Sequence, residues 1–160
     1  MIDGEDLAKA FERNLWIVRR QCQGLTHADS LIRLPFNSNC LNWILGHIAE
    51  SRDRALALLG EPPALGAAGA RYRRESEPIA GDEEGVLRLE ELLDALGRGQ
   101  ERLGAALRRA TAEDLERQIE AFGRADSVHR WLFFLYFHDS YHTGQTDLLR
   151  QAAGKNDKII

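Results

Sequence analysis

The chain has 160 residues, of which 44% are apolar and 29% are charged, and its formal net charge is −4. This length and composition are typical of one soluble globular domain, so we expect residues 1–160 to fold as a single unit. The acidic balance and the scattered basic residues give no support to nucleic-acid binding.

Neither export nor membrane insertion is expected. The longest apolar run, residues 131–137, is far shorter than the ~20 residues that a membrane-spanning helix needs. The N-terminus is acidic and has no apolar signal-peptide core. Cys22 and Cys40 follow no recognisable pattern, so both are expected to be free thiols in a reducing cytoplasm.

Two helices are expected in the first part of the chain. The first runs from about Asp3 to Gly24, where apolar residues recur every three or four positions and acidic residues occupy the first turn. The second begins near residues 37–39 (Asn-Ser-Asn), whose types favour N-caps, and ends at Gly60. Its apolar stripe includes His47.

A long loop and a third helix follow. Prolines and glycines punctuate residues 61–81, which predicts a loop. Asp82 is a suitable cap for the third helix, in which apolar residues alternate spacings of three and four from Val86 to Leu107. Such a seam packs against other helices. Thr111 is expected to cap one short helical piece after it.

The fourth helix is expected from Asp126 or Ser127 to Gly154, which would act as a C-terminal cap. One stripe along it consists of Trp131, Leu135, His138, His142, Gln145 and Leu149. Residues 131–137 are apolar on every side, and a helix without a polar face is buried all round or lies at a subunit interface. A small domain buries such a helix with difficulty, so we expect a homodimer.

Four long helices without sustained strand alternation predict an all-α fold. The expected architecture is a four-helix bundle with a long loop between helices 2 and 3. That loop could serve as a crossover connection or as a lid.

His138 and His142 are the candidate functional residues of the fourth helix. Residues four apart lie on one helix face, so two imidazoles at this spacing can bind one divalent metal ion. Both follow the most apolar run of the chain, where a buried imidazole needs a partner for its nitrogens. A shared metal ion would supply one; hydrogen bonds within the core are the alternative interpretation.

His47 is a candidate third ligand. It lies on the stripe of the second helix next to Gly46, and Gly144 lies two residues after His142. Because glycine lets a neighbouring backbone approach closely, the two glycines predict a tight helix crossing at the metal. Three histidines leave an open coordination position, which is typical of catalytic rather than structural zinc sites.

The residues His138-Asp139-x-x-His142 also have the spacing of the zinc-protease motif HExxH, with aspartate in place of glutamate. Aspartate is one methylene shorter, and no sheet is predicted that could bind a peptide strand, so a protease is disfavoured. Asp139 is expected to point to a neighbouring helix or to orient a ligand histidine. His27 and His129 are expected to be surface or capping residues.

The stretches 42–48 (NWILGHI) and 138–145 (HDSYHTGQ) together resemble the DinB-like (YfiT-like) family of metal-binding four-helix bundles. In that family three histidines bind a divalent metal ion, commonly zinc or nickel, so the resemblance implies His47, His138 and His142 as ligands. Many relatives carry glutamate after the first histidine of the second motif. Characterised relatives include S-transferases that use low-molecular-weight thiols and a thiol-dependent isomerase, which implies a small-molecule substrate.

Three functions remain open: a metal-dependent enzyme of the thiol S-transferase or hydrolase type, a non-enzymatic metal-stabilised binding or stress-response module, and a bundle without metal. A metal ion held by neutral imidazoles could activate a thiol or a water molecule. For the enzyme, Gln145 is expected to hydrogen-bond substrate or metal-bound water, and Trp43 to line the pocket or pack in the core. Arg71, Arg73 and Arg74 could hold an anionic substrate if their loop folds over the site.

Overall fold

The computed structural model of the chain describes residues 3–121 and 123–159. The helices are α1 (Gly4–Cys22), α2 (His27–Ser30), α3 (Leu41–Leu58), the 3₁₀ helix η1 (Gly66–Tyr72), α4 (Leu89–Arg109), α5 (Ala112–Glu116) and α6 (Val128–Ala152), and the strands are β1 (Gln118–Ala121) and β2 (Arg124–Ser127). None of the described helices is long and apolar enough to cross a membrane.

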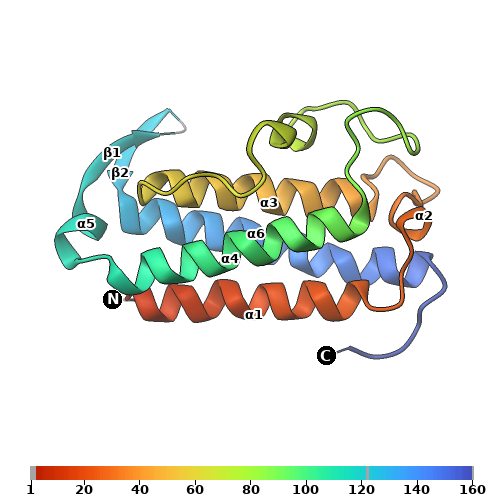
Figure 1. Ribbon diagram of the computed structural model, residues 1–160, viewed down its shortest axis with the longest axis horizontal. Helices are drawn as coiled ribbons and strands as arrows, with labels where there is room; N and C mark the ends of the chain where they lie inside the picture. The colour runs from red at the N-terminus through yellow and green to blue at the C-terminus, as the bar shows by residue number, and fades with distance from the viewer. Residues whose placement is uncertain (1–2, 122, 160) are drawn as a thin grey trace.

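The four long helices α1, α3, α4 and α6 lie side by side and form a bundle (Figure 1). Helices α1 and α3 each contact both α4 and α6. Helices α3 and α4 run in the same direction, so the chain between them returns along the bundle before α4 begins (Figure 1). The long loop is therefore a crossover connection. The predicted all-α bundle is confirmed.

The ends of α1 and α6 lie where the sequence predicts them. Asp3 caps α1 by accepting a hydrogen bond from the N–H of Asp6 at 2.8 Å. Ser127 caps α6 by accepting from the N–H of Arg130. Gly154 follows the last turn of α6 with a φ of 78°, a left-handed conformation that glycine adopts without strain.

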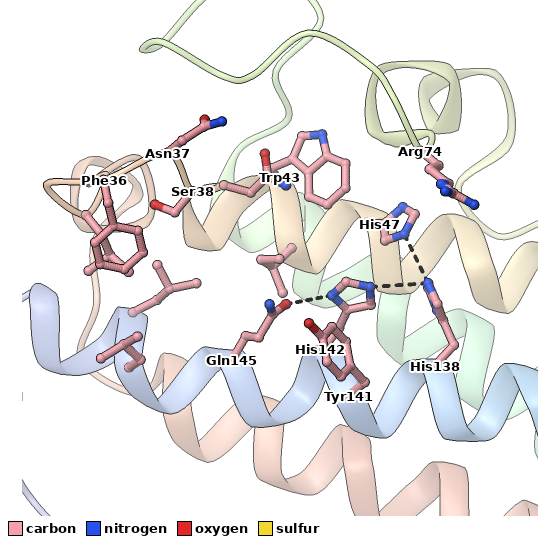
Figure 2. A pocket seen from close by; sticks show the side chains of 15 residues that line it. Phe36, Asn37, Ser38, Trp43, His47, Arg74, His138, Tyr141, His142 and Gln145 are labelled. Atoms are coloured by element: carbon pink, nitrogen blue, oxygen red, sulfur yellow. Dashed lines mark hydrogen bonds between the residues drawn. The ribbon is translucent and has the colours of Figure 1, made fainter.

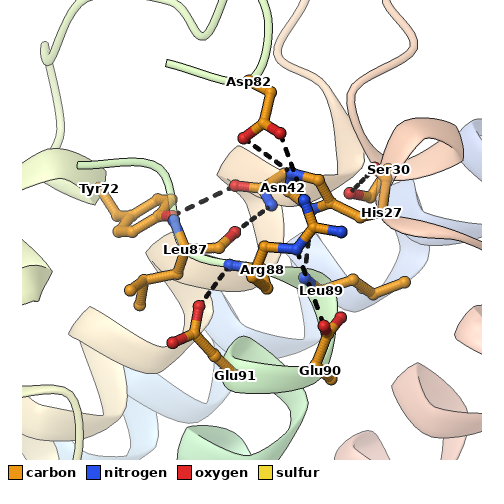
Figure 3. Close-up of polar contacts among 10 residues, drawn as sticks. All are labelled: His27, Ser30, Asn42, Tyr72, Asp82, Leu87, Arg88, Leu89, Glu90 and Glu91. Carbon is orange, nitrogen blue, oxygen red and sulfur yellow. Dashed lines mark hydrogen bonds and ion pairs between the residues drawn. The ribbon is translucent and has the colours of Figure 1, made fainter. Parts of the chain in front are cut away.

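Helix α4 begins later than expected, and Asp82 does not cap it. The helix starts at Leu89, after Gly85, whose φ of 83° interrupts any helical path from residue 82. The N–H of Leu89 donates to Nδ1 of His27 at 3.2 Å, and Asp82 lies 3.3 Å from Nε2 of the same ring (Figure 3). His27 is thus a buried capping residue rather than a surface one.

A small hairpin that no sequence pattern predicts precedes α6. Strands β1 and β2 pair antiparallel, with Gln118 opposite Ser127 and Ala121 opposite Arg124. Both strands have four residues and lie largely at the surface, so their alternation is too short to be recognised. The expected absence of strands is therefore wrong, although the hairpin lies at one end of the bundle (Figure 1).

Candidate metal site

His47 lies in α3 and is fixed by the loop that follows this helix. Its Nδ1–H donates to the backbone carbonyl of Tyr72 at 2.7 Å. The Tyr72 ring packs so closely on Gly46 that an added Cβ would overlap it. The indole of Trp43, one turn earlier, stacks on the imidazole with ring centroids 4.6 Å apart. These contacts leave Nε2 of His47 directed toward α6 (Figure 2).

His138 and His142 lie one turn apart on the side of α6 that faces α3 (Figure 2). The Nδ1–H of His142 donates to Oε1 of Gln145 at 2.7 Å. Nδ1 of His138 lies 3.2 Å from the hydroxyl of Ser51 on α3. In all three histidines Nδ1 is therefore engaged by a neighbouring group, which orients the ring and leaves Nε2 available.

The three Nε2 atoms converge (Figure 2). Nε2 of His138 lies 3.2 Å from Nε2 of His47 and 3.2 Å from Nε2 of His142. Ligand atoms of all three lie within 4.8 Å of one another, close enough to hold one metal ion. Since Nδ1 carries the proton in His47 and His142, their Nε2 atoms present lone pairs. A single N–H on Nε2 of His138 cannot donate to the lone pairs of both His47 and His142. One cation can instead accept a lone pair from each of the three Nε2 atoms, so these atoms fit a divalent metal ion.

All three imidazoles are disposed to be neutral near pH 7. Burial lowers the pKa of His47 and of His142. Burial, and to a smaller extent the two neighbouring imidazoles, lowers the pKa of His138 to about 4. Metal ligation requires the neutral ring, so protons compete weakly for this site.

Asp139 points away from the histidines into the bundle. Its carboxylate forms a buried ion pair with Arg52, with Oδ2 2.7 Å from Nε, and it accepts a hydrogen bond from Nδ2 of Asn14 at 2.8 Å. Two roles were expected for Asp139, and the structure shows the first, contact with neighbouring helices. The Nδ1 atoms of His138 and His142 have other partners.

The two glycines differ from each other. Gly46 is in close contact, although its neighbour is the ring of Tyr72 rather than a second helix. Gly144 is exposed, and no described atom that could obstruct it lies within 4 Å of a Cβ added there. The predicted tight crossing at Gly144 is therefore wrong.

The three histidines form part of the wall of a cavity of about 580 Å³. This volume lies in the range of small-molecule sites. Trp43 and Gln145 also line the cavity, as do residues 37–39. Those three residues were expected to cap the second helix, but α3 begins after Cys40 without a side-chain cap. Instead they contribute polar groups to the cavity wall, and Figure 2 shows Asn37 and Ser38 at one end of it.

The three arginines around Tyr72 have different surroundings. Arg74 lines the cavity beside the histidines (Figure 2). Arg71 pairs with Glu83 and donates to a loop carbonyl at 2.7 Å. Arg73 is exposed and is not among the described lining residues. The predicted arginine cluster is thus divided, with one member placed to meet a ligand.

Sequence reasoning missed two partners of the histidines. Ser51 lies one turn after His47 in the same apolar stripe, which was an available signal that the two share a face. Tyr72 contacts His47 from 25 residues further along the chain, in a segment without helical periodicity. No sequence pattern could have identified that carbonyl as a partner.

Both cysteines are buried free thiols, as expected for unpaired residues. Burial raises the pKa of both, and that of Cys22 rises to about 12. Neither is among the described residues that line the cavity. Neither thiol is therefore suited to act as a nucleophile there.

These features define a four-helix bundle in which the second and last long helices bring three histidines together at a cavity. A family model of the DinB superfamily matches residues 10–146, and the chain belongs to this superfamily. A crystal structure described as "the conserved protein of locus from Enterococcus faecalis" shares the fold with a TM-score of 0.76. The two chains are 16% identical, over 96% of this chain and 98% of the other. No curated protein matches the sequence.

Proposed function

We propose that the protein binds one divalent metal ion, zinc or nickel, through the Nε2 atoms of His47, His138 and His142. We further propose that it is an enzyme of the low-molecular-weight-thiol S-transferase or hydrolase type. The observation that carries the proposal is the convergence of three Nε2 atoms on the wall of a cavity of small-molecule size. When bound, the metal ion would supply Lewis acidity toward a thiol or a water molecule.

Neighbouring groups would prepare the histidines for this role. The carbonyl of Tyr72 and the amide oxygen of Gln145 hold the proton on Nδ1, which makes Nε2 the ligand atom. Gln145 also lines the cavity, and its amide nitrogen can donate to a substrate oxygen. The stacked indole of Trp43 forms a wall of the cavity and limits the movement of His47.

An S-transferase reaction in this site would use a thiol from outside the protein. Cys22 and Cys40 are buried, and burial raises the pKa of each thiol. A nucleophilic thiolate at neutral pH therefore has to come from a small molecule that enters the cavity.

A non-enzymatic metal-stabilised binding or stress-response module is the second candidate. The observation in its favour is that His47 belongs to α3 whereas His138 and His142 belong to α6. A metal ion shared by two helices would stabilise the bundle whether or not a reaction takes place. The enzyme would convert a substrate, whereas the module would not.

Metal analysis and turnover assays test both statements. We expect wild-type protein to retain about one equivalent of zinc or nickel, and the His47→Ala and His142→Ala variants to lose it. A His129→Ala variant, changed at a partly exposed histidine of α6, should retain the metal. Metallated wild-type protein should consume a low-molecular-weight thiol with an electrophile, or hydrolyse an ester or amide.

The possible results are distinct. Folded protein with less than about half an equivalent of metal would contradict metal binding. Full metal occupancy without turnover across thiols, electrophiles, esters and amides would contradict the enzyme and leave the module as the better account. Turnover that survives in His142→Ala would place the reaction elsewhere.

A further inference from the structure

The cavity beside the histidines differs in charge from the rest of the molecule. The chain has 25 acidic and 21 basic residues. Among the described residues that line the cavity, none is an aspartate or glutamate, and Arg74 is the single arginine or lysine. A site that pairs an arginine with neutral side chains favours an anionic ligand.

The residues two positions before and two positions after Arg74 are both hydrogen-bonded to residues of the histidine site. On one side, the carbonyl of Tyr72 accepts the hydrogen bond from His47. On the other, the hydroxyl of Ser76 accepts a hydrogen bond from Nε1 of Trp43 at 2.9 Å. The turn between these anchors therefore has a fixed place above α3.

The turn itself has a constrained shape. The N–H of Ser76 donates to the carbonyl of Arg73 at 3.0 Å, which closes the turn. Glu75 has a φ of 68°, a left-handed conformation that non-glycine residues adopt infrequently. Backbone outliers of this kind are maintained where the surrounding structure determines them, often beside ligand sites. Here the turn presents Arg74 to the cavity (Figure 2).

The guanidinium of Arg74 is accessible to a ligand. Its side chain is 85% exposed, and its ion pair with Glu75 has a separation of 3.7 Å. The carboxylate of Glu75 is itself 83% exposed, and ion pairs between such exposed groups contribute little free energy. An anion in the cavity can therefore replace Glu75 as the partner of Arg74.

Large apolar side chains also line the cavity. Phe36, Tyr141 and Leu148 line it, yet they are 61%, 59% and 51% exposed. Exposed apolar side chains that gather around one concave site are typical of ligand-binding surfaces. They would cover the apolar body of a bound molecule.

We infer that the cavity takes a small amphipathic anion, and that Arg74 is the residue that selects for its charge. The anionic group pairs with the guanidinium, and the apolar body contacts Phe36, Tyr141 and Leu148. The inference rests on the proposed function, because it assigns a ligand class to the same site. It concerns recognition, so it can be tested by binding as well as by turnover.

Calorimetric titration of zinc-loaded protein tests the inference with hexanoate, hexyl phosphate, acetate and hexylamine as probes. Hexanoate or hexyl phosphate should bind more tightly than acetate, which lacks the apolar body, and more tightly than the cationic amine. Arg74→Gln should weaken binding of the longer anion by about tenfold. Arg73→Gln, a matched change one residue earlier and outside the cavity, should leave binding unchanged.

The same samples separate this inference from the proposed function, because their zinc content is measured before titration. Loaded protein that binds hexylamine as well as both anions, or that is affected equally by the two arginine variants, would overturn the inference and leave metal binding intact. Folded protein that fails to take up zinc but still binds hexanoate through Arg74 would retain the anion site and contradict the metal centre. Comparison of hexanoate with hexyl phosphate distinguishes a carboxylate from a phosphate ligand.

Discussion

Tyr72 connects the long loop to the histidine site through three of its groups. Its carbonyl accepts the Nδ1–H of His47, and its ring fills the space beside Gly46. Its hydroxyl donates to Asn42 at 3.2 Å and accepts from the N–H of Leu87 at 2.8 Å. The side chain is fully buried. The orientation of one candidate ligand therefore depends on a residue of the loop.

The surroundings of Gly46 and Gly144 predict opposite effects of a change to alanine on the free energy of unfolding. In Gly46→Ala the new methyl group would overlap the ring of Tyr72, so we expect a loss of about 1–3 kcal/mol in unfolding free energy and weaker metal retention. In Gly144→Ala the methyl group enters open space in an exposed helical position, and we expect a gain of about 0.5–1 kcal/mol. Urea denaturation of both metal-free variants measures these effects. Equal shifts in the same direction would contradict the packing described.

The sequence identifies the three histidines but not the groups that orient them. The spacing of His138 and His142 reports a shared helix face directly, and the apolar stripe around His47 places it in the core. The hydrogen bonds to Tyr72 and Ser51 depend on how a loop and two helices meet, which no local pattern encodes.

At the scale of the elements, one buried guanidinium joins the four long helices. Arg52 of α3 pairs with Asp139 of α6 at 2.7 Å. It also donates to Oε1 of Gln100 on α4 and to the carbonyl of Phe11 on α1, each at 3.0 Å. Such a pair adds little net stability, because both charges are removed from water. Here it holds α3 against α6 beside the histidines.

Removal of one partner from this network should be costly. Arg52→Met would leave the carboxylate of Asp139 buried without its counter-charge, and we expect a loss of about 3–5 kcal/mol in unfolding free energy. Arg98→Met, at an exposed position of α4, should change stability by less than about 1 kcal/mol. The double change Arg52→Met and Asp139→Leu should recover part of the loss. An Arg52→Met variant as stable as Arg98→Met would contradict the role of the pair.

The elements that periodicity could detect were predicted, and those fixed by distant contacts were not. The stripes of α1, α3 and α6 are long enough to define helices, and Ser127 and Gly154 mark the ends of α6. The start of α4 depends instead on His27, which caps it from another part of the chain (Figure 3). The short hairpin before α6 has too few alternating residues to be recognised.

At the scale of the whole molecule, α6 leaves one aromatic face uncovered. Phe133, Phe134 and Phe137 are 44%, 42% and 61% exposed, whereas Leu132 and Leu135 of the same run are buried. One chain therefore does not bury all sides of this run, and a second copy of the chain would cover the exposed face. The homodimer remains a prediction.

Light scattering coupled to size-exclusion chromatography measures the association state directly. We expect wild-type protein to elute with the mass of two chains, and Phe137→Glu to shift it toward one chain, because a charge would be buried at the interface. Trp16→Glu changes another exposed aromatic residue, on α1, and should leave the mass unchanged. A wild-type mass of one chain at micromolar concentration would contradict self-association through α6.

The central claim is that three imidazoles from α3 and α6 bind one divalent metal ion. X-ray absorption at the metal edge of zinc-loaded protein tests it most directly. We predict about three imidazole nitrogens at about 2.0 Å from zinc, no sulfur ligand, and the loss of this signal in His138→Ala. A first shell that contains sulfur, or an unchanged shell in His138→Ala, would contradict the account.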